Sequence, residues 1–91
     1  MENKIRNYTN GLFRLKNSLD FAEIMNHGFE YVNSESWSAG NNTETEIDFF
    51  MKDGKKLIRI ISTIETESEG TLTYQSTWVD TSLYNLFLVK I

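Results

Sequence analysis

Two short acidic runs are the residues whose types and spacing could do chemistry in this chain. The stretches TETEID and ETESEG both place carboxylates at every second position. They are Glu44, Glu46 and Asp48 in the first stretch, and Glu65, Glu67 and Glu69 in the second. Alternate residues of a strand lie about 7 Å apart on one face, a separation at which two carboxylates can share a task. The same spacing arises wherever one face of a strand meets water. The runs are therefore a chemical site, a surface for a basic partner, or a solvated strand face.

Catalytic motifs are missing around these carboxylates. Neither run has the spacing of a cation-binding loop, and the chain has no glycine-rich phosphate loop, GxSxG motif or metalloprotease motif. The absence of cysteine excludes disulfides and thiolate metal sites. The single histidine, His27, stands near the end of a predicted helix, where its protonated ring interacts favourably with the helix dipole. We therefore predict no enzymatic activity, no cofactor and no metal.

Length and composition indicate one folded domain. The chain has 91 residues, of which 40% are hydrophobic and 13% aromatic, enough for a modest core. No window approaches the ~18 apolar residues of a membrane span. The opening MENKIRNYTNG lacks the apolar core of a signal peptide. The sequence therefore predicts a single domain over residues 1–91, without a membrane partner and located in the cytoplasm.

Charge is unevenly distributed along the chain. The formal net charge is −4, which disfavours direct binding to a nucleic-acid backbone. Residues 20–51 contain seven acidic residues and no Lys or Arg, whereas residues 1–19 and 52–60 each carry a net charge of +3. Such an acidic block would be complementary to a protein that has a groove of Lys and Arg. Electrostatic steering would favour the association of the two proteins.

The stretch NSLDFAEIMNHG predicts a short helix over residues 18–28. Asp20 followed by Glu23 fits a capping pair at its start, and Gly28 supplies the left-handed residue that ends it. A helix this short needs packing on a sheet. The stripe that should face the sheet consists of Phe21, Ile24 and Met25. Residues 1–17 are predicted to be an irregular arm or a hairpin closed at Asn10-Gly11, with Tyr8 opposite Phe13.

A long hairpin with Asp53-Gly54 at its tip should form the centre of the sheet. A two-residue turn at these positions fixes which residues of the two strands lie opposite each other. One face then holds Lys52–Lys55, Phe50–Leu57, Asp48–Arg59 and Glu46–Ile61, and the other holds Phe49–Ile58 and Ile47–Ile60. The second face is apolar throughout and is predicted to be the core. The first should meet solvent, with Phe50 exposed as an apolar group inside an acidic rim.

Three further segments complete the predicted sheet over residues 29–91. The alternation of side-chain types at every second position from Phe29 to Trp37 indicates a strand. A three-residue loop Ser68-Glu69-Gly70 would turn Tyr74 and Trp78 toward the core. This loop predicts the pairs Ile64–Tyr74, Ser62–Ser76 and Ile60–Trp78. The apolar C-terminus favours a buried strand, with a helix from Asp80 as the alternative. The sum is an α+β domain in which one short helix packs on an antiparallel sheet of four to six strands, in two layers.

In composition the chain resembles the small inhibitor proteins of phages and mobile elements, including anti-CRISPR proteins, and also small toxin-immunity proteins. It shares their small size, acidic charge, lack of cysteine, charge blocks and lack of a catalytic set. The resemblance implies a non-enzymatic protein-binding module in the cytoplasm of a bacterial host. It would occupy the basic surface of a nucleic-acid-handling protein. The predicted contact residues are Glu44, Glu46, Asp48, Phe50, Glu65, Glu67 and Glu69.

Two other classes of function fit the same sequence. The first is a structural homo-oligomer, such as a homodimer, assembled through the C-terminal strand or an exposed sheet edge. The second is a small-ligand or catalytic domain, which requires a concave pocket containing His27 or a carboxylate pair with a perturbed pKa.

Overall fold

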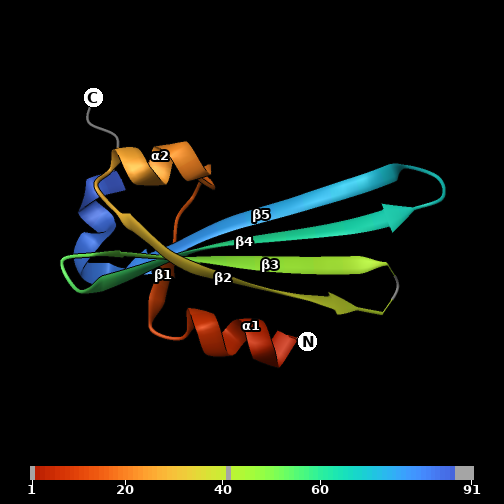
Figure 1. The fold of residues 1–91 in the computed structure, drawn as a ribbon, viewed down its shortest axis with the longest axis horizontal. Helices are drawn as coiled ribbons and strands as arrows, with labels where there is room; N and C mark the ends of the chain where they lie inside the picture. The colour runs from red at the N-terminus through yellow and green to blue at the C-terminus, as the bar shows by residue number, and fades with distance from the viewer. Residues whose placement is uncertain (1, 41, 88–91) are drawn as a thin grey trace.

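The protein is built on a five-stranded antiparallel sheet with the strand order β1-β5-β4-β3-β2. The computed structural model describes residues 2–40 and 42–87, with the side chains of all of these except residues 2–4 and 39. The elements (Figure 1) are α1 (Glu2–Thr9), β1 (Leu12–Arg14), α2 (Phe21–Asn26), β2 (Glu30–Ala39), β3 (Thr43–Lys52), β4 (Lys55–Thr66), β5 (Gly70–Asp80) and the 3-10 helix η1 (Thr81–Phe87). The predicted α+β class with an antiparallel sheet is confirmed.

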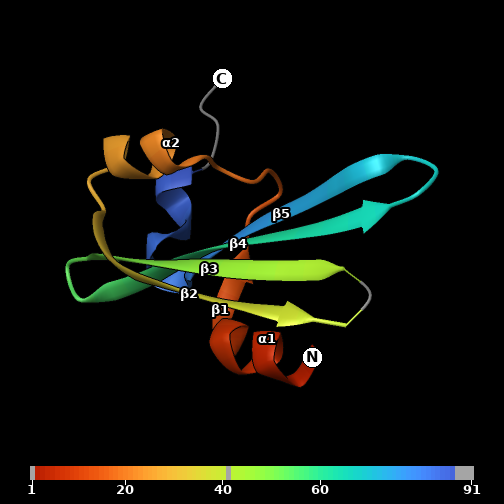
Figure 2. The same cartoon turned by 45° about the vertical axis from the view of Figure 1, so that its right-hand side comes forward.

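Helices lie on both faces of the sheet. In Figures 1 and 2, α2 is on one side of the strands and α1 is on the other. The α1 helix adds a layer to the predicted two. The hairpin or arm predicted for residues 1–17 is wrong, because Ile5 and Tyr8 at helical spacing pack on the sheet and stabilise a helix. The Asn10-Gly11 pair ends that helix, with Gly11 at φ +81.

The local signals of α2 are present as predicted. The Asp20 carboxylate accepts the Glu23 N–H at 2.8 Å, and the Glu23 carboxylate accepts the Asp20 N–H at 3.0 Å. Gly28 follows the helix at φ +88. Lys52 of the central hairpin donates its Nζ to the His27 carbonyl at 2.8 Å, so the hairpin tip is attached to the end of the helix.

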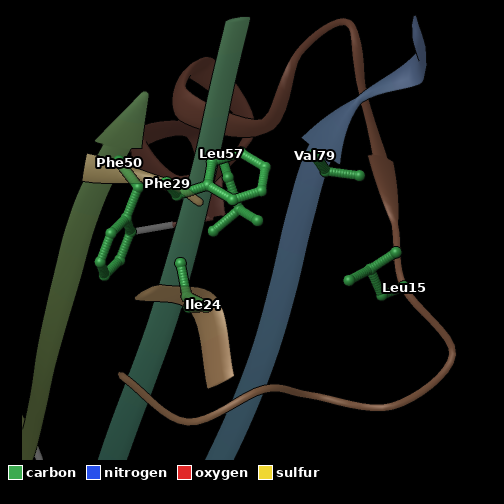
Figure 3. Close-up of a cluster of buried hydrophobic side chains, with 6 residues drawn as sticks. All are labelled: Leu15, Ile24, Phe29, Phe50, Leu57 and Val79. Carbon is green, nitrogen blue, oxygen red and sulfur yellow. The ribbon is translucent and has the colours of Figure 1, made fainter. Parts of the chain in front are cut away.

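The face of the sheet under α2, called the α2 face, has a core of its own. Figure 3 shows its six buried side chains, which are Leu15, Ile24, Phe29, Phe50, Leu57 and Val79. Leu83, Tyr84 and Phe87 of η1 pack against them. The opposite face, called the α1 face, buries Ile47, Ile58 and Ile60. The prediction of one apolar core face and one solvated face is therefore wrong near the hairpin tip, because helices cover both sides there.

The register of the β3–β4 hairpin is confirmed in all six predicted pairs, from Lys52–Lys55 at the tip to Glu46–Ile61. The β4–β5 register has the predicted parity but is displaced by two residues. Ile64 pairs with Leu72, Ser62 with Tyr74, and Ile58 with Trp78. The turn consists of residues 67–69, because the Thr66 hydroxyl accepts the Glu69 N–H at 3.0 Å and donates to the Gly70 carbonyl at 2.9 Å. Trp78 and Phe49 pack as predicted at the α1-face core, but Tyr74 is 57% exposed.

A β-bulge interrupts the alternation predicted for β2. Tyr31 lies opposite Phe50 and Asn33 lies opposite Phe49, which leaves Val32 as an extra residue. The bulge changes the parity of the strand. Tyr31 therefore lies on the α2 face, whereas Glu35 and Trp37 lie on the α1 face.

The C-terminal segment predicted as a strand forms η1 over residues 81–87, while residues 88–91 lie outside the described ones. The Asp80 carboxylate accepts the Ser82 N–H at 2.9 Å and the Ser82 hydroxyl at 2.7 Å. These two bonds lower the pKa of Asp80. The alternative of a helix from Asp80 is therefore closer to the structure, in which η1 begins one residue later, at Thr81. Among the described residues, no helix has the length and apolar character needed to cross a bilayer.

The strands continue past both helices toward two hairpin tips (Figure 1). We call this part the distal half, which comprises residues 36–39, 43–46, 61–66 and 70–75 of β2 to β5. The remainder of β2 to β5 is the covered half. Thr45 is the only buried residue among the distal side chains that are described.

Candidate functional site

Three of the six predicted acidic residues lie on the α2 face of the distal half. Glu44 and Glu46 lie there on β3. Glu65 lies on the same face of β4, because Glu44 pairs with Thr63 and Glu65 follows two residues later. Glu67 and Glu69 are in the exposed turn at the tip. All five side chains are exposed, so each is accessible to a partner.

Asp48 is a correction to the predicted site. It is 2% exposed and forms an ion pair with Arg59 at 2.9 Å. Its second oxygen accepts the Ser34 hydroxyl at 2.6 Å, and Ser34 is within 2.6 Å of the Tyr31 hydroxyl. A buried carboxylate paired in this way cannot contact a partner. It anchors a polar network on the border between the covered and distal halves.

Phe50 is the second correction, because it is fully buried rather than an exposed anchor. Its ring makes edge contacts with Phe21 at 5.2 Å and Tyr31 at 5.7 Å between centroids. The sequence did not predict the burial of Phe50, because the pairing of Phe50 with Leu57 does not show that α2 covers both residues. The outer members of this aromatic cluster, Phe21 and Tyr31, are 41% and 44% exposed.

A shallow groove runs across the acidic face. It consists of two adjoining hollows of about 570 and 370 Å³ that share Ser38, Glu44 and Thr63 in their lining. Glu65 lines the larger hollow, and Glu46 lines the smaller one. Among the described residues, no Lys or Arg forms an ion pair with Glu44 or Glu65. The groove therefore presents uncompensated negative charge along a polar, concave surface.

Glu46 has a perturbed acidity. A hydrogen bond to Asp48, partial burial and the negative charge of Asp48 raise the pKa of Glu46, while Arg59 opposes the shift. The hydrogen bond to Asp48 is the largest of these causes, and the like charge two residues along the strand adds to it. Glu46 is thus linked through Asp48 to the ion pair with Arg59.

His27 lies in a separate hollow of about 520 Å³, lined also by Leu19, Glu23 and Phe87. Its Nδ1 is 2.8 Å from the Glu23 carbonyl oxygen, and its ring packs on Phe87 at 4.6 Å between centroids. No hydrogen bond joins His27 to another polar side chain in the described part of the chain. The Glu23 carbonyl therefore orients the His27 ring, and the described residues give the ring no hydrogen-bonded nucleophile.

The described residues contain no group of three or more His, Asp or Glu side chains placed to hold a metal ion. The chemistry of the acidic face is therefore that of carboxylates facing water.

Sequence reasoning missed two polar contacts near the site. The Tyr8 hydroxyl of α1 donates to the Glu35 carboxylate of β2, a contact that raises the pKa of Tyr8. Ser34 connects Tyr31 to Asp48. Both depend on the Val32 bulge, which no sequence signal marks.

Comparison with known proteins gives no relative from which a function could be transferred. No protein-family model matches the sequence, and neither curated proteins nor solved structures give a significant match.

Proposed function

We propose that the protein is a non-enzymatic binding module that uses the acidic face of its distal half to occupy a basic surface of another protein. The observation that carries the proposal is the exposure of Glu44, Glu46 and Glu65 around one groove on the α2 face of the distal half, beyond the residues that pack against α2 and η1. The distal half contributes no buried hydrophobic residue to either core, and of its described side chains only Trp37 packs against one. The length of the strands is explained by what they present to solvent.

The partner is proposed to be a nucleic-acid-handling protein, because such proteins carry a groove of Lys and Arg for phosphates. Alternate strand positions hold Glu44 and Glu46 about 7 Å apart on a rigid backbone. Carboxylates held in this way compete with phosphates for the same cationic side chains and lose little conformational freedom on binding. The module thereby acts as an inhibitor of the type found in phages and mobile elements, in a bacterial cytoplasm.

The contact set is narrower than the sequence alone indicated. It comprises Glu44, Glu46 and Glu65 in the groove and Glu67 and Glu69 at the tip. Asp48 and Phe50 serve the fold instead, since they are buried. Charge reversal at the five exposed positions should therefore preserve folding, whereas reversal at Asp48 should not.

The test is affinity capture from a bacterial lysate with three baits. These are the wild type, a triple variant with Glu44→Lys, Glu46→Lys and Glu65→Lys, and the control Glu30→Lys, which changes an exposed acid at the start of β2. A stoichiometric partner should be retained by the wild type and the control but not by the triple variant. Heparin, a polyanion, should release it. A partner held equally by all three baits, or no partner at all, contradicts the proposal.

A quantitative comparison removes the effect of net charge. Glu44→Lys and Glu30→Lys change the charge equally, so their affinities for the captured protein can be compared at low salt. We expect Glu44→Lys alone to weaken binding. Equal affinities would show that the groove is not the contact.

A further inference from the structure

The outer edge of β5 is unpaired over residues 70–76. β1 pairs only with Trp78, Val79 and Asp80, and the Leu15 N–H extends this pairing to the Thr77 carbonyl at 2.9 Å. Beyond that point, no strand among the described residues lies beside β5. The edge therefore presents backbone hydrogen-bonding groups to solvent.

The register shows which backbone groups face the open edge. The Thr77 carbonyl points toward β1, and N–H and C=O of every second residue of a strand point to the same side. Thr71, Thr73 and Gln75 therefore direct their N–H and C=O outward. Leu72 and Tyr74 direct theirs toward β4.

This edge lacks the features that prevent strands from pairing. Residues 70–76 contain no charged residue and no proline, and no bulge interrupts their pairing with β4. The other edge of the sheet differs, because β2 carries the Val32 bulge and two carboxylates, Glu30 and Glu35. The covered half of the β2 edge is thus protected against further pairing, whereas residues 70–76 of β5 are not.

We propose that the outer edge of β5 pairs with the same edge of a second copy of the chain, antiparallel around a two-fold axis at Thr73. Thr73 is the centre of the open residues 70–76, so the two edges match over their full length. Thr73 then faces Thr73 of the second copy, and Thr71 faces Gln75. All three outward-facing residues form hydrogen-bonded pairs, and the two sheets become one.

Side chains on the α1 face are complementary in this register. Leu72 lies opposite Tyr74 of the second copy, and Tyr74 lies opposite its Leu72. Tyr74 is 57% exposed in the single chain and Leu72 is half-buried, so pairing covers apolar surface. On the α2 face the pairs contain only Thr and Gln, so no like charges meet.

Charges at the two ends of the paired segment are also complementary. The turn of residues 67–69 carries two carboxylates and immediately precedes Gly70. In the symmetric register, Gly70 lies opposite Ser76 of the second copy. That position adjoins the end of β1, where Arg14, whose guanidinium lies over the Trp78 ring, and Lys16, which follows the strand, are both exposed. Each acidic turn therefore lies beside a basic segment of the other copy, which is the argument for a second copy as the occupant.

The first test is sedimentation velocity over a range of protein concentrations, with the wild type and Thr73→Pro. Proline removes an N–H that does not bond to β4 and is tolerated at edge positions, so the variant should remain folded by circular dichroism. We expect a concentration-dependent dimer for the wild type and a monomer for Thr73→Pro. A wild type that stays monomeric, or a dimer that Thr73→Pro leaves intact, overturns the proposal.

The second test is a charge exchange that does not depend on proline. Lys16→Glu and Glu69→Lys should each raise the dimer dissociation constant about tenfold, because each turns two attractions per dimer into repulsions. The double variant should recover the wild-type constant. Failure of the double variant to recover, when the single variants have weakened the dimer, would contradict the register.

A residue-level measurement completes the design. Amide hydrogen exchange at Thr71, Thr73 and Gln75 should slow as the protein concentration rises, while the edge amides of β2 remain unchanged. Protection that rises on β2 instead would assign the contact to the other edge and overturn the proposal.

Discussion

The covered and distal halves of the sheet share the strands β2 to β5 and one continuous hydrogen-bond ladder, but they differ in what surrounds them. Near the Asp53-Gly54 tip, helices cover both faces, and six of the nine buried hydrophobic residues lie on these strands, all of them in the covered half. In the distal half, only Thr45 is buried among the described side chains.

The strands of 10 to 12 residues are about twice the usual length of 5–6. Their second half is therefore not required for a core. The covered half therefore supplies the stability of the domain, and the distal half supplies solvent-exposed surface.

The largest expected difference between the halves is in apolar truncation along β4. Ile58 and Ile64 lie on the same face of the same strand, but Ile58 is fully buried and Ile64 is half-buried. Ile58→Ala should lower the free energy of unfolding by about 4 kcal/mol through lost burial and a cavity. Ile64→Ala should lower it by about 1 kcal/mol. Urea unfolding followed by tryptophan fluorescence measures both, and equal losses would contradict the division of the sheet.

Removal of carboxylates from β3 should show the next largest difference. Asp48→Ala leaves the largely buried Arg59 guanidinium without its partner and should cost about 3 kcal/mol. Glu44→Ala, four residues away on the same face, should change the free energy of unfolding by less than about 0.5 kcal/mol. Urea midpoints at neutral pH provide the measurement. A loss at Asp48 as small as that at Glu44 would show that the ion pair does not support the border of the core.

Two glycines extend the comparison to the backbone. Gly28 has φ +88, and an added Cβ would lie 2.7 Å from Lys52 Nζ, whereas Gly40 near the β2–β3 turn has open space around it. Gly28→Ala should cost about 1–2 kcal/mol, chiefly from the left-handed conformation. Gly40→Ala should be neutral or slightly stabilising. Thermal unfolding distinguishes the two, and a neutral Gly28→Ala would mean that the helix end adapts freely.

The smallest expected effect concerns pH and Glu46. Because the folded state raises the pKa of Glu46, this group contributes stability when protonated, and that contribution is lost as pH rises through the folded pKa. Glu46→Gln should therefore be slightly more stable than the wild type at pH 7, by less than about 0.5 kcal/mol. The difference should vanish toward pH 4. A constant difference between urea midpoints at both pH values would show that Asp48 does not perturb Glu46.

Local signals in the sequence were sufficient for some elements. Asp53-Gly54 sets the β3–β4 register because a two-residue turn leaves no freedom in the pairing. The capping box at Asp20 and Glu23 likewise depends only on residues three apart. In both cases the interacting groups are neighbours in the chain.

Features that depend on tertiary packing could not be read in this way. The burial of Phe50 depends on α2, whose Phe21 contacts its ring, and that of Asp48 depends on Ser34 and Arg59 of the flanking strands. The helical state of residues 2–9 requires a sheet beneath Ile5 and Tyr8. The β4–β5 register was displaced by two residues because the Thr66 hydroxyl, not glycine alone, closes the turn. Of the seven predicted contact residues, the five that face water lie beyond the helices.

The Val32 bulge has a consequence for how this protein can evolve. One extra residue lets β2 supply Tyr31 to one side of the sheet and Glu35 and Trp37 to the other. A deletion there would move every later side chain of β2 to the opposite side at once. A descendant lacking that residue would need to exchange the apolar and polar positions of the strand together. An insertion or deletion at the bulge would therefore have the effect of several substitutions at once. We expect this strand to change by point mutation rather than by insertion or deletion.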